Sequence, residues 1–350
     1  MARPDPTLSH LPRRAANDVT DTSGHGTGGE VAQPAQLPLV GYIRNPKSHR
    51  NKGSSSLIGD HPRVITVEPH TRTELEEALA DFARQGIGIL AISGGDGTIR
   101  DVLTRGAHLF GDYWPEIIIL PQGKTNALAL DLGISRQWHM REALEAAGSG
   151  RTVIRRPLQL TDLSGDQRSR LGFFLGVGAF NVAIDTGQVA HRFGAFQGFA
   201  VAMTAAFGIF QVLLGFGKGP WRSLSRMRIV DGDSGEPIAH SGSCPEDLRY
   251  IGGITTLRTF PPGIKPFSKM DCSGPLSYFM LDAPLRRAAV FAPIAGLGWQ
   301  NPVLEKSGIH RGSSNSYIIE LEDPLILDGE RYPAGSYRIS AGPELRFITP

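Results

Sequence analysis

Cysteine is scarce in this sequence: Cys244 and Cys272 are the two cysteines among 350 residues. They form no CxxC pair and lack the spacing of metal ligands, so zinc is not expected and a reduced compartment fits best. The sequence also has no large excess of positive or negative charge, because its formal net charge is +2 and no run of Lys and Arg occurs. A nucleic-acid partner is therefore not expected.

Three common catalytic motifs are also missing. The sequence contains no Walker-type GxxxxGK[ST], no GxSxG and no HExxH. The first absence excludes a P-loop enzyme, and the others argue against an α/β-hydrolase and a zinc protease.

Long apolar segments are few. Met1–Gln36 is rich in Pro, Gly, Ser and Thr without an apolar stretch, so we expect a disordered tail outside the fold, not a secretory signal. The longest uncharged run is Phe193–Gly217, which is long enough for a membrane span of about 20 residues. Polar residues and five glycines interrupt it, which favours buried helices or helices that border an apolar cleft.

Between residues 37 and 155, short apolar strands alternate with helical patterns. Strands are expected over Leu39–Arg44, Arg63–Val67, Ile87–Ser93 and Ile117–Leu120, and helices over Thr73–Gln85, through Ile99, Val102 and Leu103, and from Asn126 to Leu132. This alternation predicts a doubly wound, Rossmann-like α/β domain whose ligand binds at the carboxyl ends of the strands. The last strand of the chain could return to this domain.

Residues 156–350 have a different pattern, with strands punctuated by Gly and Pro. Strands are expected over Leu158–Leu163, Gly172–Val177, Met227–Val230, Arg249–Leu257, Leu276–Leu281 and Ser316–Leu321, with a helix over Arg286–Leu297. The pattern predicts a second, mostly antiparallel β-sandwich domain. The cleft between the two domains is the default ligand site.

The segment SGGDGT follows one predicted strand directly and opens a helix. Its glycines let the backbone approach phosphate oxygens, and Thr98 can cap the helix or bind a phosphate. An acid has little use in an anion site unless a metal or a reacting hydroxyl is also present, so Asp96 is a candidate Mg²⁺ ligand. The loop residues in question are Gly94, Gly95, Asp96, Gly97 and Thr98.

Two further loops end predicted strands at the same edge. In QGKTN, Gly123 allows the turn, and Lys124, Thr125 and Asn126 offer a cation, a hydroxyl and an amide. Thr125 or Asn126 could instead only cap the next helix, and Lys124 could be a solvated charge. The other loop is NPKS, made of Asn45, Pro46, Lys47 and Ser48.

Near the carboxyl terminus the sequence reads ILDGE over Ile326–Glu330. Two acids around a glycine most often mark a hairpin turn. Phosphate transfer, however, needs a carboxylate that takes the proton of the acceptor hydroxyl or orients it. Asp328 or Glu330 could supply it if the last strands fold back over the cleft.

Together, Asn45–Ser48, Gly94–Thr98, Pro121–Gly133 and Leu327–Glu330 resemble the lipid kinases of the diacylglycerol kinase catalytic-domain superfamily, which includes sphingosine and ceramide kinases. The resemblance extends from Val40 to the carboxyl terminus. It implies a phosphofructokinase-like first domain, a β-sandwich second domain, ATP, and Mg²⁺ held by Asp96.

The resemblance also implies roles for individual residues. ATP would contact the NPKS residues, the Gly94–Thr98 loop, Gly123, Thr125 and Asn126. The acceptor lipid hydroxyl would meet the DGE acids, of which we favour Glu330 as proton acceptor, with Asp328 beside it. The protein would then be cytoplasmic, with access to its lipid at the inner face of the membrane.

The chain departs from the family pattern in three places. Ala127 stands where the second loop usually has an acid, and Lys124 also differs. In the segment MDCSGPL, Asp271 is displaced from the glycine of a structural Mg²⁺ site, and Thr66 and Thr71 compete for the place of one threonine. A kinase for NAD or another small molecule, and a lipid-binding protein without catalysis, are the alternatives.

Overall fold

The computed structural model describes residues 37–48, 61–165, 169–182, 223–241, 245–261, 263–270, 274–283 and 286–350. Met1–Gln36, Phe193–Gly217, Asp271 and both cysteines lie outside these ranges, so the predictions made for them stay predictions. Leu37–Pro350 forms one compact unit, and the predicted domain boundary near residue 155 is likewise untested. Within the part of the chain described here, no helix has the length and apolar character needed to cross a membrane.

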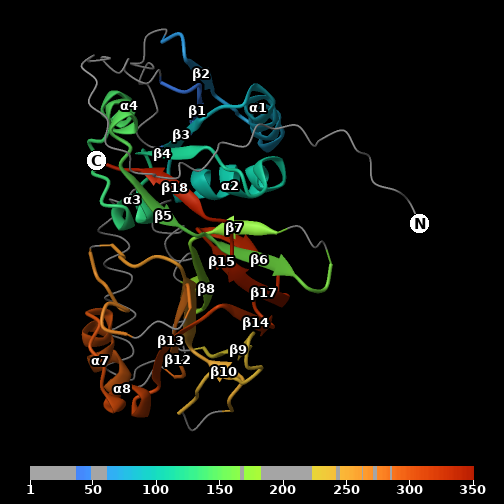
Figure 1. Cartoon of the computed structure of the whole chain (residues 1–350). Helices are drawn as coiled ribbons and strands as arrows, with labels where there is room; N and C mark the ends of the chain where they lie inside the picture. Colours follow the sequence, from blue (N-terminus) through green and yellow to red (C-terminus); the bar gives the residue numbers. More distant parts are fainter. Residues whose placement is uncertain are drawn as a thin grey trace, which may run out of the picture. The chain divides into compact units, whose positions relative to one another are not determined.

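The first sheet has six strands in the order β2-β1-β3-β4-β18-β5. Their bounds are β1 Val40–Arg44, β2 Val64–Val67, β3 Ile89–Gly94, β4 Glu116–Pro121, β5 Thr152–Arg155 and β18 Leu345–Ile348. The strands from β2 to β18 run parallel, and β5 is antiparallel to β18. β1 and β3 are buried along their whole length, as expected for strands covered on both faces. Figure 1 shows β18, in red, between β4 and β5.

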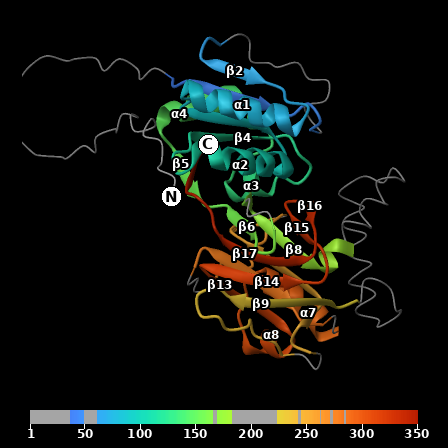
Figure 2. The ribbon, with the colours of Figure 1, turned by 90° about the vertical axis from the view of Figure 1, so that its right-hand side faces the viewer.

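The helices among the described residues of this half are α1 Arg72–Gln85, α2 Asp96–Phe110, α3 Ala127–Asp131 and α4 Met140–Ser149. Thr71 caps the start of α1, and Gly86 ends it in the left-handed conformation, which costs glycine little. The apolar face of α1 buries Leu75, Leu79 and Phe82. α1 and α2 pack against each other along the first sheet (Figure 2).

The described residues between β5 and β18 include two antiparallel six-stranded sheets. The second sheet, in the order β10-β9-β14-β17-β6-β7, comprises β6 Leu158–Asp162, β7 Arg170–Gly172, β9 Ser225–Asp231, β10 Leu248–Arg249, β14 Ser316–Leu321 and β17 Gly335–Ala341. The third, in the order β13-β12-β11-β8-β15-β16, comprises β8 Phe174–Gly178, β11 Ile251–Thr255, β12 Leu276–Leu281, β13 Ile309–Ser314, β15 Leu325–Leu327 and β16 Glu330–Tyr332. Helices α7 Arg286–Gly296 and α8 Pro302–Lys306 accompany them.

Side chains from both antiparallel sheets share one core. Leu160 and Ile339 enter it from the second sheet, and Leu175, Met280 and Leu327 enter it from the third. This is the arrangement of a β-sandwich. The predicted fold class, a parallel-rich α/β part followed by an antiparallel part, is confirmed.

Two predicted strands are wrong in their extent. The strand expected over Gly172–Val177 is split between β7 and β8, which belong to different sheets. At the break, the amides of Phe173 and Phe174 turn away from the ladder and donate to the carboxylate of Asp328. The strand expected over Arg249–Leu257 is divided in the same way, into β10 and β11. An apolar run does not reveal where a chain leaves one sheet for the next.

Candidate functional site

The two glycine loops of the first sheet touch each other where β3 and β4 end. A Cβ added to Gly123 would lie 2.5 Å from the Cα of Gly95, and one added to Gly95 would lie 2.9 Å from the Cα of Gly123. Side chains are therefore excluded from both positions. The glycines bring two backbones together at the strand ends, where ligands of such sheets bind.

Helix α2 begins at this contact with no side-chain cap on Gly95. The NPKS loop supports the turn from the other side, because the side-chain amide of Asn45 donates to the hydroxyl of Thr98 over 2.7 Å. Asn45 also accepts a hydrogen bond from the amide of Lys47, whose ammonium group donates to the carbonyl of His70. The predicted loops thus meet around one uncapped helix start, which suits an anion.

The second loop has a divided role. Asn126 adopts a left-handed conformation, and its side-chain amide both accepts from the Gly123 amide and donates to the Gly123 carbonyl. It is buried, whereas Lys124 and Thr125 are exposed at the surface of the loop. The structure therefore uses Asn126 to shape the loop and leaves Thr125 accessible to a ligand.

Asp96, in the first turn of α2, reaches the start of α3. Its carboxylate accepts a hydrogen bond from the amide of Leu128 over 3.2 Å, where Asn126 provides no side-chain cap. Burial raises the pKa of the Asp96 carboxyl, and the backbone amides of α3 offset part of that rise. Ala127, which replaces the usual acid, is one of these amide donors.

The DGE segment forms the tight turn between β15 and β16. Asp328 and Gly329 both have positive φ, 44° and 83°, as a type I′ hairpin requires. The Asp328 carboxylate accepts hydrogen bonds from the amides of Phe173 and Phe174, over 2.9 and 3.0 Å. Burial, and then the nearby Asp96 carboxylate, raise the pKa of Asp328 from 3.8 to about 7. An acid from the far end of the chain thus lies close to Asp96.

Glu330 lies among positive charges, whereas Asp328 lies near the negative charge of Asp96. The Glu330 carboxylate receives two hydrogen bonds of 2.7 Å from Arg72 and contacts Arg100 at 2.5 Å. Burial alone would raise the pKa of Glu330, but the hydrogen bond from Arg72 and the charge of Arg100 lower it overall. A carboxylate held by two guanidinium groups is a weaker base than the buried carboxylate of Asp328, whose pKa is raised.

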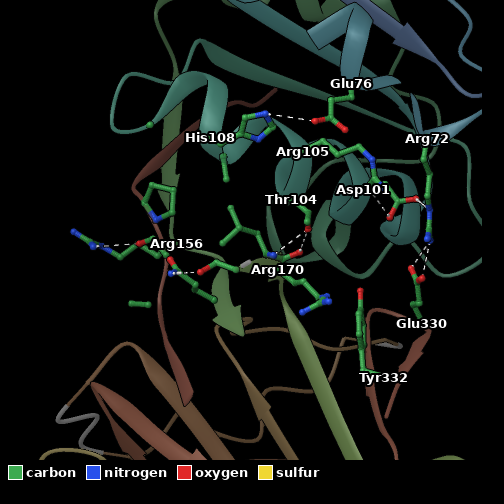
Figure 3. Close-up of a pocket in the computed structure, with 18 of the residues that line it drawn as sticks. Arg72, Glu76, Asp101, Thr104, Arg105, His108, Arg156, Arg170, Glu330 and Tyr332 are labelled. Carbon is green, nitrogen blue, oxygen red and sulfur yellow. Dashed lines mark hydrogen bonds and ion pairs between the residues drawn. The ribbon is translucent and has the colours of Figure 1, made fainter. Parts of the chain in front are cut away.

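A groove of about 1080 Å³ is lined in part by α2 (Figure 3). Its walls come from α1, α2, β6, β7, β16 and the chain after β17, and include Arg72, Asp101, Arg105, Glu330 and Tyr332. Neither Asp96 nor Asp328 is among its lining residues. Glu330 therefore belongs to the wall of this groove, whereas Asp328 belongs to the site at the strand ends.

The Asp96 carboxylate fits a magnesium ion that is shared with phosphate. The described residues contain no cluster of three His, Cys, Asp or Glu side chains suited to a metal. Asp96 nevertheless lies close enough to Asp328 for its charge to raise the pKa of that carboxyl. Mg²⁺ commonly takes one or two carboxylates and completes its shell with water and substrate phosphates.

The structure describes Thr66 and Thr71, the two candidates for the place of the family's threonine, but not Asp271. The hydroxyl of Thr71 accepts from the amide of Glu74 and so caps α1, while Thr66 lies in β2. For the proposed second metal, Asp271 lies outside the described residues.

Arg100 is a residue that the sequence analysis missed. It is buried in α2, and its guanidinium group reaches both Glu330 and the backbone of the DGE turn. A signal was present, because Arg100 follows Asp96 by four residues and so lies on the same face of the helix. What the spacing could not show is that the last strands would supply its partners.

Comparisons with known proteins agree with this geometry. Residues 41–155 match the family model of the diacylglycerol kinase catalytic domain. No curated protein matches the chain. The crystal structure of a diacylglycerol kinase from Bacillus anthracis str. Sterne is similar over 90% of this chain and 98% of that chain, with a TM-score of 0.59 and 15% identity. A candidate diacylglycerol kinase from the same organism has a TM-score of 0.60, 14% identity and the same coverage.

At this identity the two solved structures bear on the fold, while the family match bears on the segment that holds the NPKS, GGDGT and QGKTN loops. Residues 41–155 therefore match a diacylglycerol kinase catalytic domain, and the resemblance predicted from the sequence is confirmed.

Proposed function

We propose that the protein is an ATP-dependent lipid kinase, which transfers a phosphate to a hydroxyl of diacylglycerol or of a sphingoid lipid. The observation that carries the proposal is the position of Asp328. A buried carboxylate whose pKa is about 7 lies beside Asp96, at a helix start built for an anion. A general base works best when its pKa is near the working pH.

In this proposal each loop has one task. The amides at the start of α2 bind phosphate oxygens, and Thr98 and Thr125 offer hydroxyls to the nucleotide. Asp96 would hold Mg²⁺, which supplies charge stabilisation at the transferring phosphate. Asp328 takes the proton of the acceptor hydroxyl, and the amides of Phe173 and Phe174 keep its carboxylate oriented.

A group of aromatic rings next to Asp328 supports a lipid acceptor. Phe174, whose amide bonds Asp328, has ring centroids 5.2 Å from Phe180, 6.0 Å from Phe260 and 6.3 Å from Phe279. These four rings are partly exposed. Partly exposed apolar rings beside a candidate base suit an acyl or sphingoid chain better than a sugar or a nucleotide. Such an acceptor would be met at a membrane surface.

The test is a transfer assay with radiolabelled ATP and Mg²⁺. Diacylglycerol, ceramide, sphingosine and NAD are offered separately, and labelled product is separated by solvent extraction and chromatography. We expect label in one of the lipids. Transfer to NAD alone would establish the small-molecule alternative. Lipid binding without transfer would establish a non-catalytic protein, the alternative suggested by Ala127 in the second loop.

Replacing Gly123 by Ala should weaken ATP binding by more than tenfold and lower the free energy of unfolding by about 1–3 kcal/mol. The added methyl would lie 2.5 Å from the Cα of Gly95, and backbone cannot move aside as a flexible side chain does. Isothermal titration with ATP and Mg²⁺ and chemical denaturation measure the two effects. Gly148→Ala is the matched control, because an added Cβ there meets nothing within 4 Å inside α4. Equal affinities of Gly123→Ala and the wild type would contradict the phosphate role of this loop.

A further inference from the structure

Arg100 connects helix α2 to the DGE turn, which is formed by Asp328, Gly329 and Glu330. Its side chain is 7% exposed, and it projects from the helix turn that follows Asp96. One terminal nitrogen, Nη1, donates to the carbonyls of Leu327 and Asp328 over 3.2 and 3.3 Å. A guanidinium group thus binds the backbone of the residue that carries the candidate base.

The other nitrogens of Arg100 have partners as well. Nε and Nη2 donate to Oδ1 of Asp101 over 3.2 and 2.8 Å, and Nη2 lies 2.5 Å from Oε2 of Glu330. The guanidinium group of Arg100 therefore makes five contacts with four oxygen atoms. Lysine has three donors on one flexible point charge and cannot reproduce this planar arrangement.

Glu330 completes the connection from the groove side. Figure 3 shows Arg72 of α1 pointing at its carboxylate, with Asp101 beside them. Glu330 is thus bound by guanidinium groups from two helices, Arg72 from α1 and Arg100 from α2. The pair with Arg100 is the more buried of the two, because the Arg72 side chain is 57% exposed and that of Arg100 is 7% exposed. A buried charge pair defines a geometry even where its net contribution to stability is small.

We propose that Arg100 is a positioning residue for phosphate transfer: by bonding the Leu327 and Asp328 carbonyls and Glu330, it fixes the Asp328 carboxylate opposite Asp96. The inference rests on the proposed function. The contacts of Arg100 are with Asp101, Glu330 and the backbone of the turn. Arg100 acts through the placement of the turn, where a shift of about 1 Å is enough to lower a rate about a hundredfold.

The first test compares Arg100→Lys with Arg249→Lys. Arg249 is a matched control, because it is also buried and bonds a carboxylate, Asp282, and the carbonyls of Ile238 and Ala239 in the antiparallel part. Both changes remove a buried guanidinium group. We expect kcat to fall about 10- to 100-fold in Arg100→Lys, with the KM for ATP within about threefold of wild type, and kcat to stay near wild type in Arg249→Lys. A kcat within threefold of wild type in folded Arg100→Lys would overturn the proposal.

A double-mutant cycle separates positioning from a general loss of structure. If Arg100 acts through Asp328, Arg100→Lys should change the residual single-turnover rate of Asp328→Asn by less than about twofold. The same fold-loss in both backgrounds would show that Arg100 does not act through Asp328.

Amide hydrogen exchange gives a readout that needs no activity. Arg100→Lys should speed exchange of the amides of Phe173, Phe174 and Asp328, which bond to or within the DGE turn, and Arg249→Lys should leave them unchanged. Unchanged exchange in Arg100→Lys would contradict the proposal that Arg100 fixes the DGE turn. If exchange changes as expected while the wild type phosphorylates none of the acceptors, Arg100 does fix the turn and the proposed function fails.

Discussion

Asp328→Asn should lower kcat for lipid phosphorylation by about 10²–10⁴-fold, the usual contribution of a general base. Asparagine has nearly the same shape but keeps one oxygen, so one of the amides of Phe173 and Phe174 loses its acceptor, and asparagine cannot take a proton. Single-turnover transfer from radiolabelled ATP measures the loss, and the midpoint of thermal unfolding shows whether the variant is folded.

The pH dependence of the wild type should report the same group. The pKa of Asp328 is raised to about 7, and a base must be deprotonated, so kcat/KM should rise with pH up to about 7 and level off above it. A raised pKa means that the folded state holds the proton more tightly than the unfolded state. The Asp328 contribution to stability is therefore present at acidic pH and is lost as the pH rises from 3.8 to about 7.

Glu330→Gln serves as the control for Asp328→Asn. Glutamine keeps hydrogen-bond acceptance towards Arg72 and Arg100 but lacks the charge. If Asp328 is the base, Glu330→Gln should lose less activity and keep the acidic limb of the pH profile. A larger loss in Glu330→Gln than in Asp328→Asn would return the role to Glu330, as the family resemblance suggested.

The effect of Asp328 on stability is measured by unfolding in the presence of EDTA. The free energy of unfolding of the wild type, minus that of Asp328→Asn, should decrease between about pH 4 and 7.

Asp96→Asn should lower phosphate transfer by about 10³-fold or more while the protein stays folded. A metal ion at a transferring phosphate contributes several kcal/mol, and each 1.36 kcal/mol is a factor of ten in rate. Stability should change little, because the substituted asparagine can still accept the hydrogen bond from the Leu128 amide and burial already disfavours the charge of Asp96. Transfer rates over a range of Mg²⁺ concentrations check the effect.

Asp112→Asn is the matched control for Asp96. It removes a carboxylate that lies beyond the other end of α2 and lines the groove, far along the helix from the candidate metal site. We expect it to transfer phosphate at nearly the wild-type rate. An Asp96→Asn variant as active as Asp112→Asn would remove Asp96 from metal binding.

The loops of the first sheet were readable from the sequence because their signals are local. Gly94–Thr98 and Gly123–Asn126 each follow an apolar run and open a helix, and parallel strands present their carboxyl ends at one edge. The edge of the sheet therefore followed from periodicity and turn chemistry. Family resemblance then supplied an expected role for an acid near the carboxyl terminus.

The choice between Asp328 and Glu330 could not be made in the same way. The two acids are two residues apart in the sequence and identical in charge, and the sequence favoured neither by any local signal. Their environments differ because residues distant in the sequence surround them. Phe173, Phe174 and Asp96 lie near Asp328, while Arg72 and Arg100 bind Glu330.

By itself, the sequence determined the alternating α/β pattern, the glycine loops with Asp96 at a helix start, and a hairpin at Asp328–Glu330. Tertiary structure decided that β18 takes the place between β4 and β5 in the first sheet, that one apolar run divides into β7 and β8, and that Arg100 joins α2 to the hairpin. The physical reason is the distance along the sequence over which each interaction acts. Periodicity and turn preferences act over a few residues, whereas burial, pKa and ion pairing depend on which distant segments the folded chain brings together.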